Sequence, residues 1–323
     1  MKLATFQHKD AARLGVVLGA QVLDLTAAAP AAEFQSMQAL IEAGPAALDR
    51  ARRLVEQRRD DAAHMFPLAD VRLLAPLPVP AQIRDFSVFP GHIKQAPAGM
   101  ARLAALARGD AAAAAAAKPL DDVPAVYRQQ PLYYLSNRFS VVGPDAVVPW
   151  PRYSRVMDFE LEFGIFISTR GKDIARAEAV SHIFGYTIYN DFSARDTQRI
   201  EMQGRLGPAK GKSFDAGNAM GPWIVTPDEM PDPTRLRMGV RVNGETWASG
   251  SSADMLHDFA DMIAWVSRDE TLHPGEFFGS GTMGNGCGLE QGRFLSHGDV
   301  IEAEVEGIGV LRNRVVRQDA AQP

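Results

Sequence analysis

Apolar residues near the start of the chain are spaced as in β-strands. Two short runs, Leu14–Leu18 and Gln21–Leu25, flank a glycine turn and predict an antiparallel hairpin. Helical signals follow, because Ser36 is a favourable helix cap and the Gly44-Pro45 pair ends one helix and starts the next. The first part of the chain is therefore predicted to form a small α+β unit.

A proline-rich stretch interrupts this pattern. The second helix is expected to end near Arg59, and residues 71–80 then contain three prolines. We place a domain boundary in this stretch, between a small N-terminal domain of residues 1–72 and a larger domain of residues 73–323.

An alanine-rich segment, residues 96–118, follows the boundary and includes seven consecutive alanines, Ala111 to Ala117. Alanine is the best helix former but buries little surface. The segment is therefore expected to be a solvent-facing helical insertion or a partly disordered loop. The alternative is a lid over a nearby pocket.

Strand signals dominate the rest of the chain. Asn243-Gly244 is a strong hairpin turn, and apolar residues from Met255 to Val266 lie at helical spacing after the candidate cap Ser251-Ser252. The other strands are expected at Ser140–Val142, Phe159–Ser168, Ile183–Tyr189, Trp223–Thr226 and Val300–Arg312.

Composition and charge exclude some classes of function. The chain has 323 residues, 46% of them apolar, and a formal net charge of −5 without a basic run, so nucleic acid is not an expected partner. No apolar stretch approaches the roughly 18 residues that a membrane span needs, and the charged first ten residues do not resemble a secretory signal. The single cysteine, Cys287, fits a reducing cytoplasmic setting.

Three acidic side chains alternate with apolar ones in the run from Asp158 to Phe163. Strand side chains point to opposite faces in turn, so Asp158, Glu160 and Glu162 are expected on one face. Enclosed carboxylates repel each other and lose hydration, and a bound cation would stabilise them. Oxygen ligands favour a hard cation, most simply Mg²⁺, with Ca²⁺ or Mn²⁺ as alternatives. The structural alternative is an exposed edge strand with a solvated acidic face.

Two further segments carry polar residues that could face a ligand. A predicted strand ends at Asp191, and Ser193 with Asp196 resembles a capping box that opens a helix. Asp85 and His92 flank a Pro-Gly turn, so we expect His92 beside a loop. A lone histidine is structural more often than catalytic, and the caps alone would be purely structural.

Together these segments resemble the fumarylacetoacetate hydrolase family from about residue 70 onward. The family's E-x-E strand corresponds to Glu160–Glu162, and its N-D-x-S-A-R-D-x-Q signature to Asn190–Gln198. The G-K-S-F and G-S-G-T segments follow as Gly211–Phe214 and Gly279–Thr282. The resemblance implies an α+β, β-rich fold, with a mixed β-roll or barrel catalytic domain after a small N-terminal α+β domain.

The same resemblance implies roles for individual residues. The implied metal ligands are Asp85, Glu160, Glu162 and Asp191. The implied catalytic residues are His92, Glu290, Arg195, Lys212 and Gln198, and the implied substrate contacts are Tyr134 and Thr282. Each has a structural alternative: Lys212 could pair with a carboxylate, Gln198 could lie on a helix surface, and Glu290 could be exposed near a loop.

The implied function is metal-dependent hydrolysis of a carbon–carbon bond in a 1,3-dicarbonyl, acylpyruvate or related 2-oxo acid, in aromatic or amino-acid catabolism. A homodimer in the cytoplasm is the corresponding expectation. A lyase or isomerase (decarboxylase, hydratase or tautomerase) on the same metal scaffold is the first alternative, and a non-catalytic metabolite-binding protein is the second. The loop Gly284–Gly288, which contains Cys287, departs from the family pattern.

Overall fold

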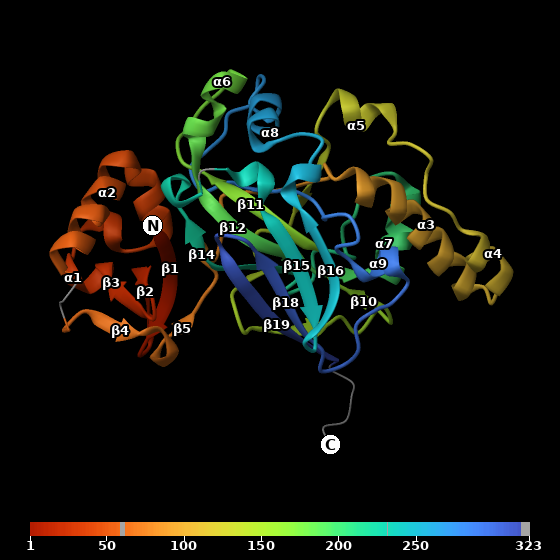
Figure 1. The fold of residues 1–323 in the computed structure, drawn as a ribbon, viewed down its shortest axis with the longest axis horizontal. Helices are drawn as coiled ribbons and strands as arrows, with labels where there is room; N and C mark the ends of the chain where they lie inside the picture. Colours follow the sequence, from red (N-terminus) through yellow and green to blue (C-terminus); the bar gives the residue numbers. More distant parts are fainter. Residues whose placement is uncertain (59–61, 231, 318–323) are drawn as a thin grey trace.

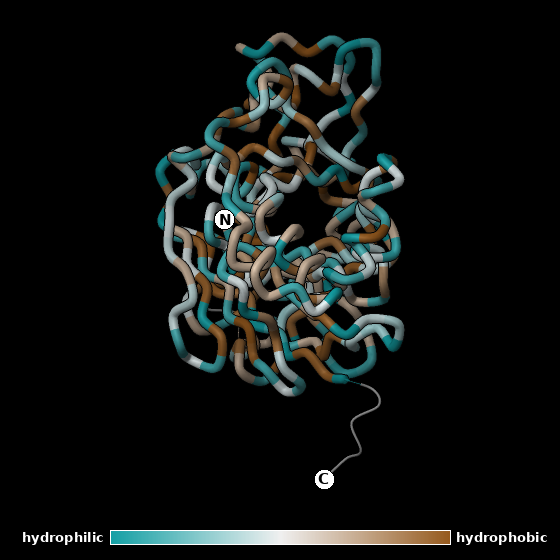
Figure 2. The backbone as a smooth tube through the Cα atoms, turned by 90° about the vertical axis from the view of Figure 1, so that its right-hand side faces the viewer, coloured by the Kyte–Doolittle hydropathy of each residue, from teal (hydrophilic) through white to brown (hydrophobic). Residues whose placement is uncertain are grey.

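The computed structural model describes residues 1–58, 62–230 and 232–317. Figure 1 shows the N-terminal unit at one end, two sheets in the middle, and the helices of residues 90–129 at the opposite end. In Figure 2, hydrophobic and hydrophilic residues are interspersed along the tube, and no helix in the described ranges has the length and apolar character that a bilayer crossing needs.

A large mixed sheet runs through the molecule. Among the described residues it joins twelve strands: β1 (Lys2–His8), β2 (Ala11–Leu18), β3 (Gln21–Asp24), β4 (Met65–Pro67), β5 (Arg72–Leu73), β6 (Ile83–Phe86), β7 (Tyr133–Ser136), β8 (Val141–Val142), β11 (Leu161–Ile167), β12 (Ile183–Asp191), β14 (Asn218–Val225) and β17 (Phe277–Gly279). Its main path is β4-β3-β2-β1-β14-β12-β11-β17-β6-β7, so β11 and β12 are central strands.

A second sheet packs against the middle of the first. Its order is β16 (Glu245–Ser251), β15 (Arg237–Val242), β18 (Val300–Val305), β19 (Gly309–Arg317) and β9 (Val147–Trp150). A short pair, β10 (Met157–Asp158) with β13 (Ser193–Ala194), lies beside the functional residues. This mixed α+β, sheet-rich architecture confirms the predicted fold class.

The helices are short apart from two. They are α1 (Leu25–Ala28), α2 (Met37–Arg58), α3 (Pro90–Ala107), α4 (Ala111–Ala116), α5 (Ala125–Gln129), α6 (Arg176–Ala179), α7 (Arg195–Glu201), α8 (Phe259–Val266) and α9 (Gly288–Gln291). The 3₁₀ turns are η1 (Ala32–Phe34), η2 (Leu68–Asp70), η3 (Val180–His182), η4 (Met202–Gly204), η5 (Pro227–Glu229), η6 (Pro233–Arg235) and η7 (Ser252–Asp254).

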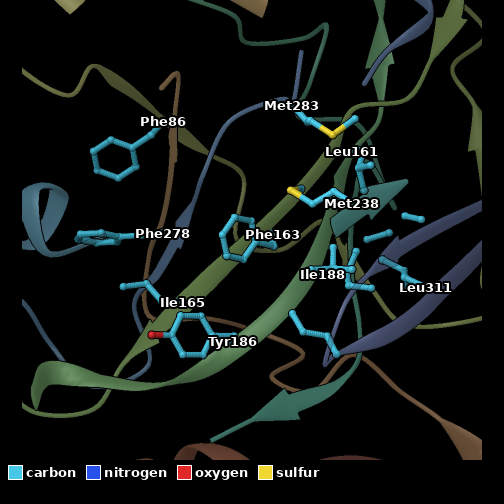
Figure 3. Packing of buried hydrophobic residues seen from close by; sticks show 14 of the residues in the cluster. Phe86, Leu161, Phe163, Ile165, Tyr186, Ile188, Met238, Phe278, Met283 and Leu311 are labelled. Atoms are coloured by element: carbon cyan, nitrogen blue, oxygen red, sulfur yellow. The ribbon is translucent and has the colours of Figure 1, made fainter. Parts of the chain in front are cut away.

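The core between the two sheets explains the alternating pattern of β11. Leu161, Phe163 and Ile165 project from β11 into a buried cluster that also contains Ile188 and Met238 (Figure 3). Glu162, which lies between Leu161 and Phe163, therefore projects from the opposite face of the strand. Because every residue of β11 is buried, the alternative of an exposed edge strand is wrong.

Several local predictions are confirmed. β2 and β3 form the expected hairpin, and β15 and β16 form the second one around Asn243 and Gly244, both at positive φ. The two expected N-terminal helices are the two halves of α2, which kinks at Gly44 (φ 74°). Ser36 caps the first half through its hydroxyl, 3.1 Å from the Ala39 amide. The expected end at Arg59 lies outside the described residues.

Two predicted helix caps are wrong. Asp258 caps α8 in a capping box with Asp261, whereas Ser251 caps only the short turn η7. Ser193 and Asp196 form no capping box at α7, because the Asp196 carboxylate instead accepts hydrogen bonds from the Ser154 hydroxyl and the Arg155 amide. A carboxylate at the right spacing caps a helix only when no nearer donor competes for it.

The alanine-rich segment is helical, as predicted. α3 covers its first part and α4 most of the alanine run, with Ala114 the buried contact of α4. The predicted boundary after residue 72 crosses the large sheet, because β1 pairs with β14 at Lys2 and Val225. The division into two domains stays a prediction.

Candidate functional site

The predicted site residues meet at one cavity of about 460 Å³. Its lining includes nearly all of them: Asp85, His92, Tyr134, Glu160, Glu162, Arg195, Gln198, Lys212 and Thr282. Asp191 and Glu290 reach the site through contacts with these residues. The exposed positions considered for Gln198 and Glu290 are wrong, because both residues are 9% exposed.

Strand register brings the acids together. On the path β12-β11-β17-β6-β7, Glu162 pairs with Tyr189 across one boundary, and Asp85 lies between Gly279 and Tyr134 across the others. Asp191 is the last residue of β12. Residues more than a hundred positions apart in the chain therefore come together at one patch of a buried sheet.

The two glycines of the G-S-G-T segment have structural roles beside these carboxylates. A Cβ added to Gly279 would lie 3.0 Å from Glu162 Oε2 and 3.2 Å from Asp85 Oδ1, closer than side chains normally pack. Gly281 has a φ of +80°, and its amide donates a 2.8 Å hydrogen bond to Glu162 Oε2. The first glycine thus leaves room for the carboxylates, and the second turns an amide toward one of them.

Asp85, Glu162 and Asp191 form the acid cluster: each offers a carboxylate oxygen within 4.8 Å of the others. The Tyr134 hydroxyl lies 2.7 Å from Asp85 Oδ2 and also contacts Asp191. Burial, followed by the charge of Asp191, raises the pKa of Asp85 well above its ordinary value. Burial and the charge of Asp85 do the same to the pKa of Glu162.

Two buried cations balance the neighbouring acids. Lys212 contacts Asp191 and lies 2.5 Å from Glu160 Oε2, while Arg195 Nη1 lies 2.7 Å from Glu160 Oε1. Burial alone would lower the pKa of Lys212, but the charges of Asp191 and Glu160 raise it. Burial likewise opposes ionisation of Glu160, yet Lys212 and Arg195 lower its pKa. Glu160 is therefore the ionised partner of these cations, outside the tight acid cluster.

The acid cluster fits a divalent cation. Asp85 Oδ1 and Asp191 Oδ1 are buried and have no hydrogen-bond partner among the described residues. Unpartnered buried carboxylate oxygens are unfavourable unless a proton or a cation satisfies them. The donor set is entirely oxygen, which suits Mg²⁺, Ca²⁺ or Mn²⁺. These three residues would hold such an ion, with Glu160 at its edge.

A second group, the imidazole cluster of His92, Cys287 and Glu290, lies beside the same cavity, which His92 lines. His92 lies in the first turn of α3, beside the short loop of residues 87–89 that precedes the helix, as expected. Its Nδ1 lies 3.0 Å from Glu290 Oε1, and the Glu290 side chain is fully buried. A carboxylate only accepts, so Nδ1 donates and Nε2 is left to accept a proton. The pair has the arrangement of a base and its orienting group.

Asp158 organises the region between the two clusters, a role that sequence reasoning missed. Its carboxylate accepts from Arg195 Nε at 2.7 Å and from the amides of Gly288 and Leu289 at 2.8 and 2.9 Å. It thereby links Arg195 to the start of α9, which carries Glu290. The predicted acidic face identified Asp158, but Arg195, Gly288 and Leu289 lie far from it in sequence.

Sequence reasoning also missed the apolar wall of the cavity. This wall is formed by Ile93, Ala96, Pro97, Met100, Tyr127, Leu132 and Leu289. Several of these come from α3, so the segment beginning at residue 96 lines the cavity as well as facing solvent. The helical periodicity of Ile93, Pro97 and Met100 was the available signal.

The chain is similar to known proteins over most of its length. The profile of the fumarylacetoacetate (FAA) hydrolase C-terminal family matches residues 102–316. The mitochondrial oxaloacetate tautomerase fahd2 of Xenopus laevis is 30% identical over 322 residues, which cover 98% of this chain and 90% of that protein.

Two solved structures are similar over nearly the whole chain. Fumarylacetoacetate hydrolase from Exiguobacterium antarcticum has a TM-score of 0.74 at 30% identity, covering 98% of this chain and 100% of that one. Maleylpyruvate hydrolase from Sphingobium sp. SYK-6, solved with manganese(II) and pyruvate, has a TM-score of 0.72 at 26% identity, covering 98% and 99%. From the matched profile, the relatives and the shared motifs, the chain belongs to the fumarylacetoacetate hydrolase family.

Proposed function

We propose that this protein is a divalent-metal-dependent hydrolase that cleaves a carbon–carbon bond in an acylpyruvate or a related 1,3-dicarbonyl acid. The observation that carries the proposal is the pairing, on one cavity, of an all-oxygen acid cluster with an oriented imidazole. The manganese(II) in the Sphingobium relative supports a divalent ion here, for which we propose Asp85, Glu162 and Asp191 as ligands and Glu160 as a fourth candidate.

The residues divide the chemistry between them. A bound cation would supply Lewis-acid polarisation of the substrate carbonyl. His92 Nε2 takes a proton from water while Glu290 holds Nδ1 and stabilises the positive charge that forms. The hydroxide attacks the acyl carbonyl carbon, the carbon–carbon bond breaks, and its electron pair leaves with the pyruvate fragment as an enolate. The proton on His92 can then return to the enolate carbon.

Arg195 and Lys212 supply positive charge near the acidic end of the substrate. Arg195 Nη2 is buried and has no hydrogen-bond partner in the described ranges, although the other nitrogens of its guanidinium contact Asp158, Glu160 and Gln198. A free, buried N–H donor beside a cavity is suited to a carboxylate or an enolate oxygen. Gln198 positions this guanidinium through a 2.9 Å bond to Nη1.

The shape of the cavity supports a substrate with an apolar acyl group. Its polar floor accommodates a 2-oxo acid, and the apolar wall extends the space along α3. Burying a methylene against such a wall contributes about 0.8 kcal/mol. Acylpyruvates with a medium-length or aromatic acyl group should therefore bind better than a four-carbon diacid.

Keto–enol tautomerisation of a 2-oxo acid is the second candidate, because a relative that matches nearly the full chain is named an oxaloacetate tautomerase. The same base and acid cluster suit this reaction, which moves a proton without attack by water. Hydrolysis releases pyruvate. Tautomerisation releases no fragment and changes only the amount of the enol form, which is followed by its ultraviolet absorption.

The test is a substrate screen on chelator-stripped protein with Mg²⁺, Mn²⁺ or no metal restored. Acylpyruvates, fumarylpyruvate-like diketo acids and oxaloacetate are followed by coupled pyruvate detection and by enol absorption. Metal-dependent pyruvate release from an acylpyruvate supports the hydrolase, pyruvate release from oxaloacetate alone indicates a decarboxylase, and enol conversion alone supports the tautomerase. Binding without conversion of any compound would favour the metabolite-binding alternative. Light scattering tests the expected homodimer in the same samples.

A further inference from the structure

The imidazole cluster contains one group that the proposed reaction leaves unused. Cys287 is fully buried, and its Sγ lies 3.9 Å from His92 Nδ1, the atom that also contacts Glu290. The nitrogen, the sulfur and a Glu290 oxygen all lie within 4.8 Å of one another. This places an imidazole, a thiol and a carboxylate at one point beside the cavity.

The distance between His92 Nδ1 and Cys287 Sγ is close to the nitrogen–sulfur distance in a tetrahedral metal site. With metal–nitrogen and metal–sulfur bonds of about 2.1 and 2.3 Å, tetrahedral geometry separates nitrogen and sulfur by roughly 3.6 Å. The observed 3.9 Å differs from this by an amount that a small side-chain rotation covers. The mixture of nitrogen, sulfur and oxygen suits Zn²⁺ or Cd²⁺, whereas Mg²⁺ prefers oxygen alone.

Glu290 gives an independent sign that a ligand belongs here. Its side chain is fully buried, and only Oε1 is engaged, by His92. Oε2 is buried without a hydrogen-bond partner among the residues that the structure describes. A buried carboxylate with one unsatisfied oxygen is available to an incoming cation.

The backbone holds the cluster in place. Cys287 is the N-cap residue of α9 and forms a β-bridge with Glu160, and Glu290 lies one turn further along α9. Asp158 fixes this turn through the amides of Gly288 and Leu289. Cys287 and Glu290 therefore come from one tethered turn. His92 lines the cavity, so an ion can reach the cluster from the substrate side.

We propose that His92, Cys287 and Glu290 form a second metal site, specific for a thiophilic divalent cation such as Zn²⁺, which inhibits the enzyme when it is filled. Coordination joins the cation to His92 Nδ1, Cys287 Sγ and a Glu290 oxygen, and the thiol proton leaves to solvent. A neutral imidazole carries one N–H hydrogen, so ligation at Nδ1 moves that hydrogen to Nε2. Nε2 then donates and no longer accepts a proton from water.

The binding test uses Cd²⁺, whose bond to a thiolate absorbs in the ultraviolet. Because the chain contains one cysteine, this absorption reports Cys287 alone. Wild-type protein is titrated in excess Mg²⁺, which occupies oxygen sites, and the band should saturate at one equivalent. His92→Phe and Glu290→Gln should each weaken Cd²⁺ binding at least about tenfold. His297→Ala, which removes an exposed histidine, is the matched control and should not change the titration.

The inhibition test adds Zn²⁺ to turnover assays in saturating Mg²⁺. Zn²⁺ should inhibit wild-type protein, and Cys287→Ser should need at least about tenfold more Zn²⁺, with circular dichroism confirming its fold. A missing wild-type Cd²⁺ band, or a band of unchanged affinity in both ligand variants, would overturn the site. A saturating band without inhibition would overturn its effect on the base. The binding result needs no substrate, so it stands apart from the outcome for the proposed reaction.

Discussion

The two clusters on the cavity differ in how the fold supports them. The acid cluster comes from three strands of one buried sheet, and Lys212 Nζ contacts one of its carboxylates, that of Asp191, together with the adjacent Glu160. The imidazole cluster comes from the first turns of α3 and α9, and no lysine or arginine is paired with Glu290 in the described ranges. One side gathers carboxylates around a candidate cation site, and the other holds an imidazole within reach of that site.

This difference separates two tasks. Charge concentrated on rigid strands suits a hard cation, which needs several oxygens at fixed positions. An imidazole works as a base only while Nε2 is unprotonated, so it must stay outside the charged group while remaining close to it. We therefore expect that a substitution in one cluster can abolish metal binding or base catalysis without abolishing the other.

The largest effect is expected from Glu162→Gln. Losing one carboxylate from the acid cluster should weaken Mn²⁺ binding at least about 100-fold and reduce turnover at least about 10³-fold, because the metal contributes several kcal/mol to the transition state. Calorimetry and turnover assays measure the two effects. Glu306→Gln, at an exposed position, is the control. Wild-type metal affinity in Glu162→Gln would remove Glu162 from the site.

His92→Ala should separate the two clusters. Loss of a general base is expected to reduce turnover about 10²–10³-fold, while Mn²⁺ binding at the acid cluster stays within about twofold of wild type. Turnover numbers and calorimetric affinities, measured on the same preparation, check this. If turnover is unchanged, His92 is not the base; if metal binding falls with turnover, the clusters are not independent.

Metal affinity should rise with pH. Burial and neighbouring acids raise the pKa values of Asp85 and Glu162, so in metal-free protein these groups keep protons above their ordinary range. A cation must displace those protons, and each one displaced strengthens binding by about tenfold per pH unit until it is lost in the free protein as well. Mn²⁺ titrations at pH 5.5 and 7.5 test the sign; equal affinities would contradict it.

Gly279→Ala should give the smallest effect. The added Cβ would crowd Glu162 Oε2 and Asp85 Oδ1, so the carboxylates must move by a few tenths of an ångström. Metal affinity should fall by about three- to tenfold, with His92 chemistry otherwise intact. Gly204→Ala is the matched control, because a Cβ there meets nothing within 4 Å. Equal effects from both substitutions would mean that Gly279 does not make room for the acids.

The sequence predicts those features of the site that depend on residues close together in the chain. The two-residue period around Glu160 and Glu162 predicts their shared face, and Asn243-Gly244 predicts its hairpin, because both signals are local. The caps at Ser193 and Ser251 were mispredicted, since the donors and acceptors that compete with them lie elsewhere in the chain.

The convergence of the site could not be derived from local patterns. Asp85 meets Gly279 through a parallel strand pair, and Cys287 meets His92 across 195 positions. Such pairings depend on tertiary register, which neither periodicity nor composition encodes. Family motifs suggested Asp85 and His92, but they contained no information on Cys287 or on the anchoring role of Asp158.

An anomalous difference map from crystals of this protein grown with Mn²⁺ tests most directly whether Asp85, Glu162 and Asp191 bind a divalent cation. We expect one strong peak about 2.0–2.4 Å from carboxylate oxygens of Asp85, Glu162 and Asp191, facing the cavity that His92 lines. A map without a peak at these carboxylates, in crystals that contain Mn²⁺ elsewhere, would contradict it.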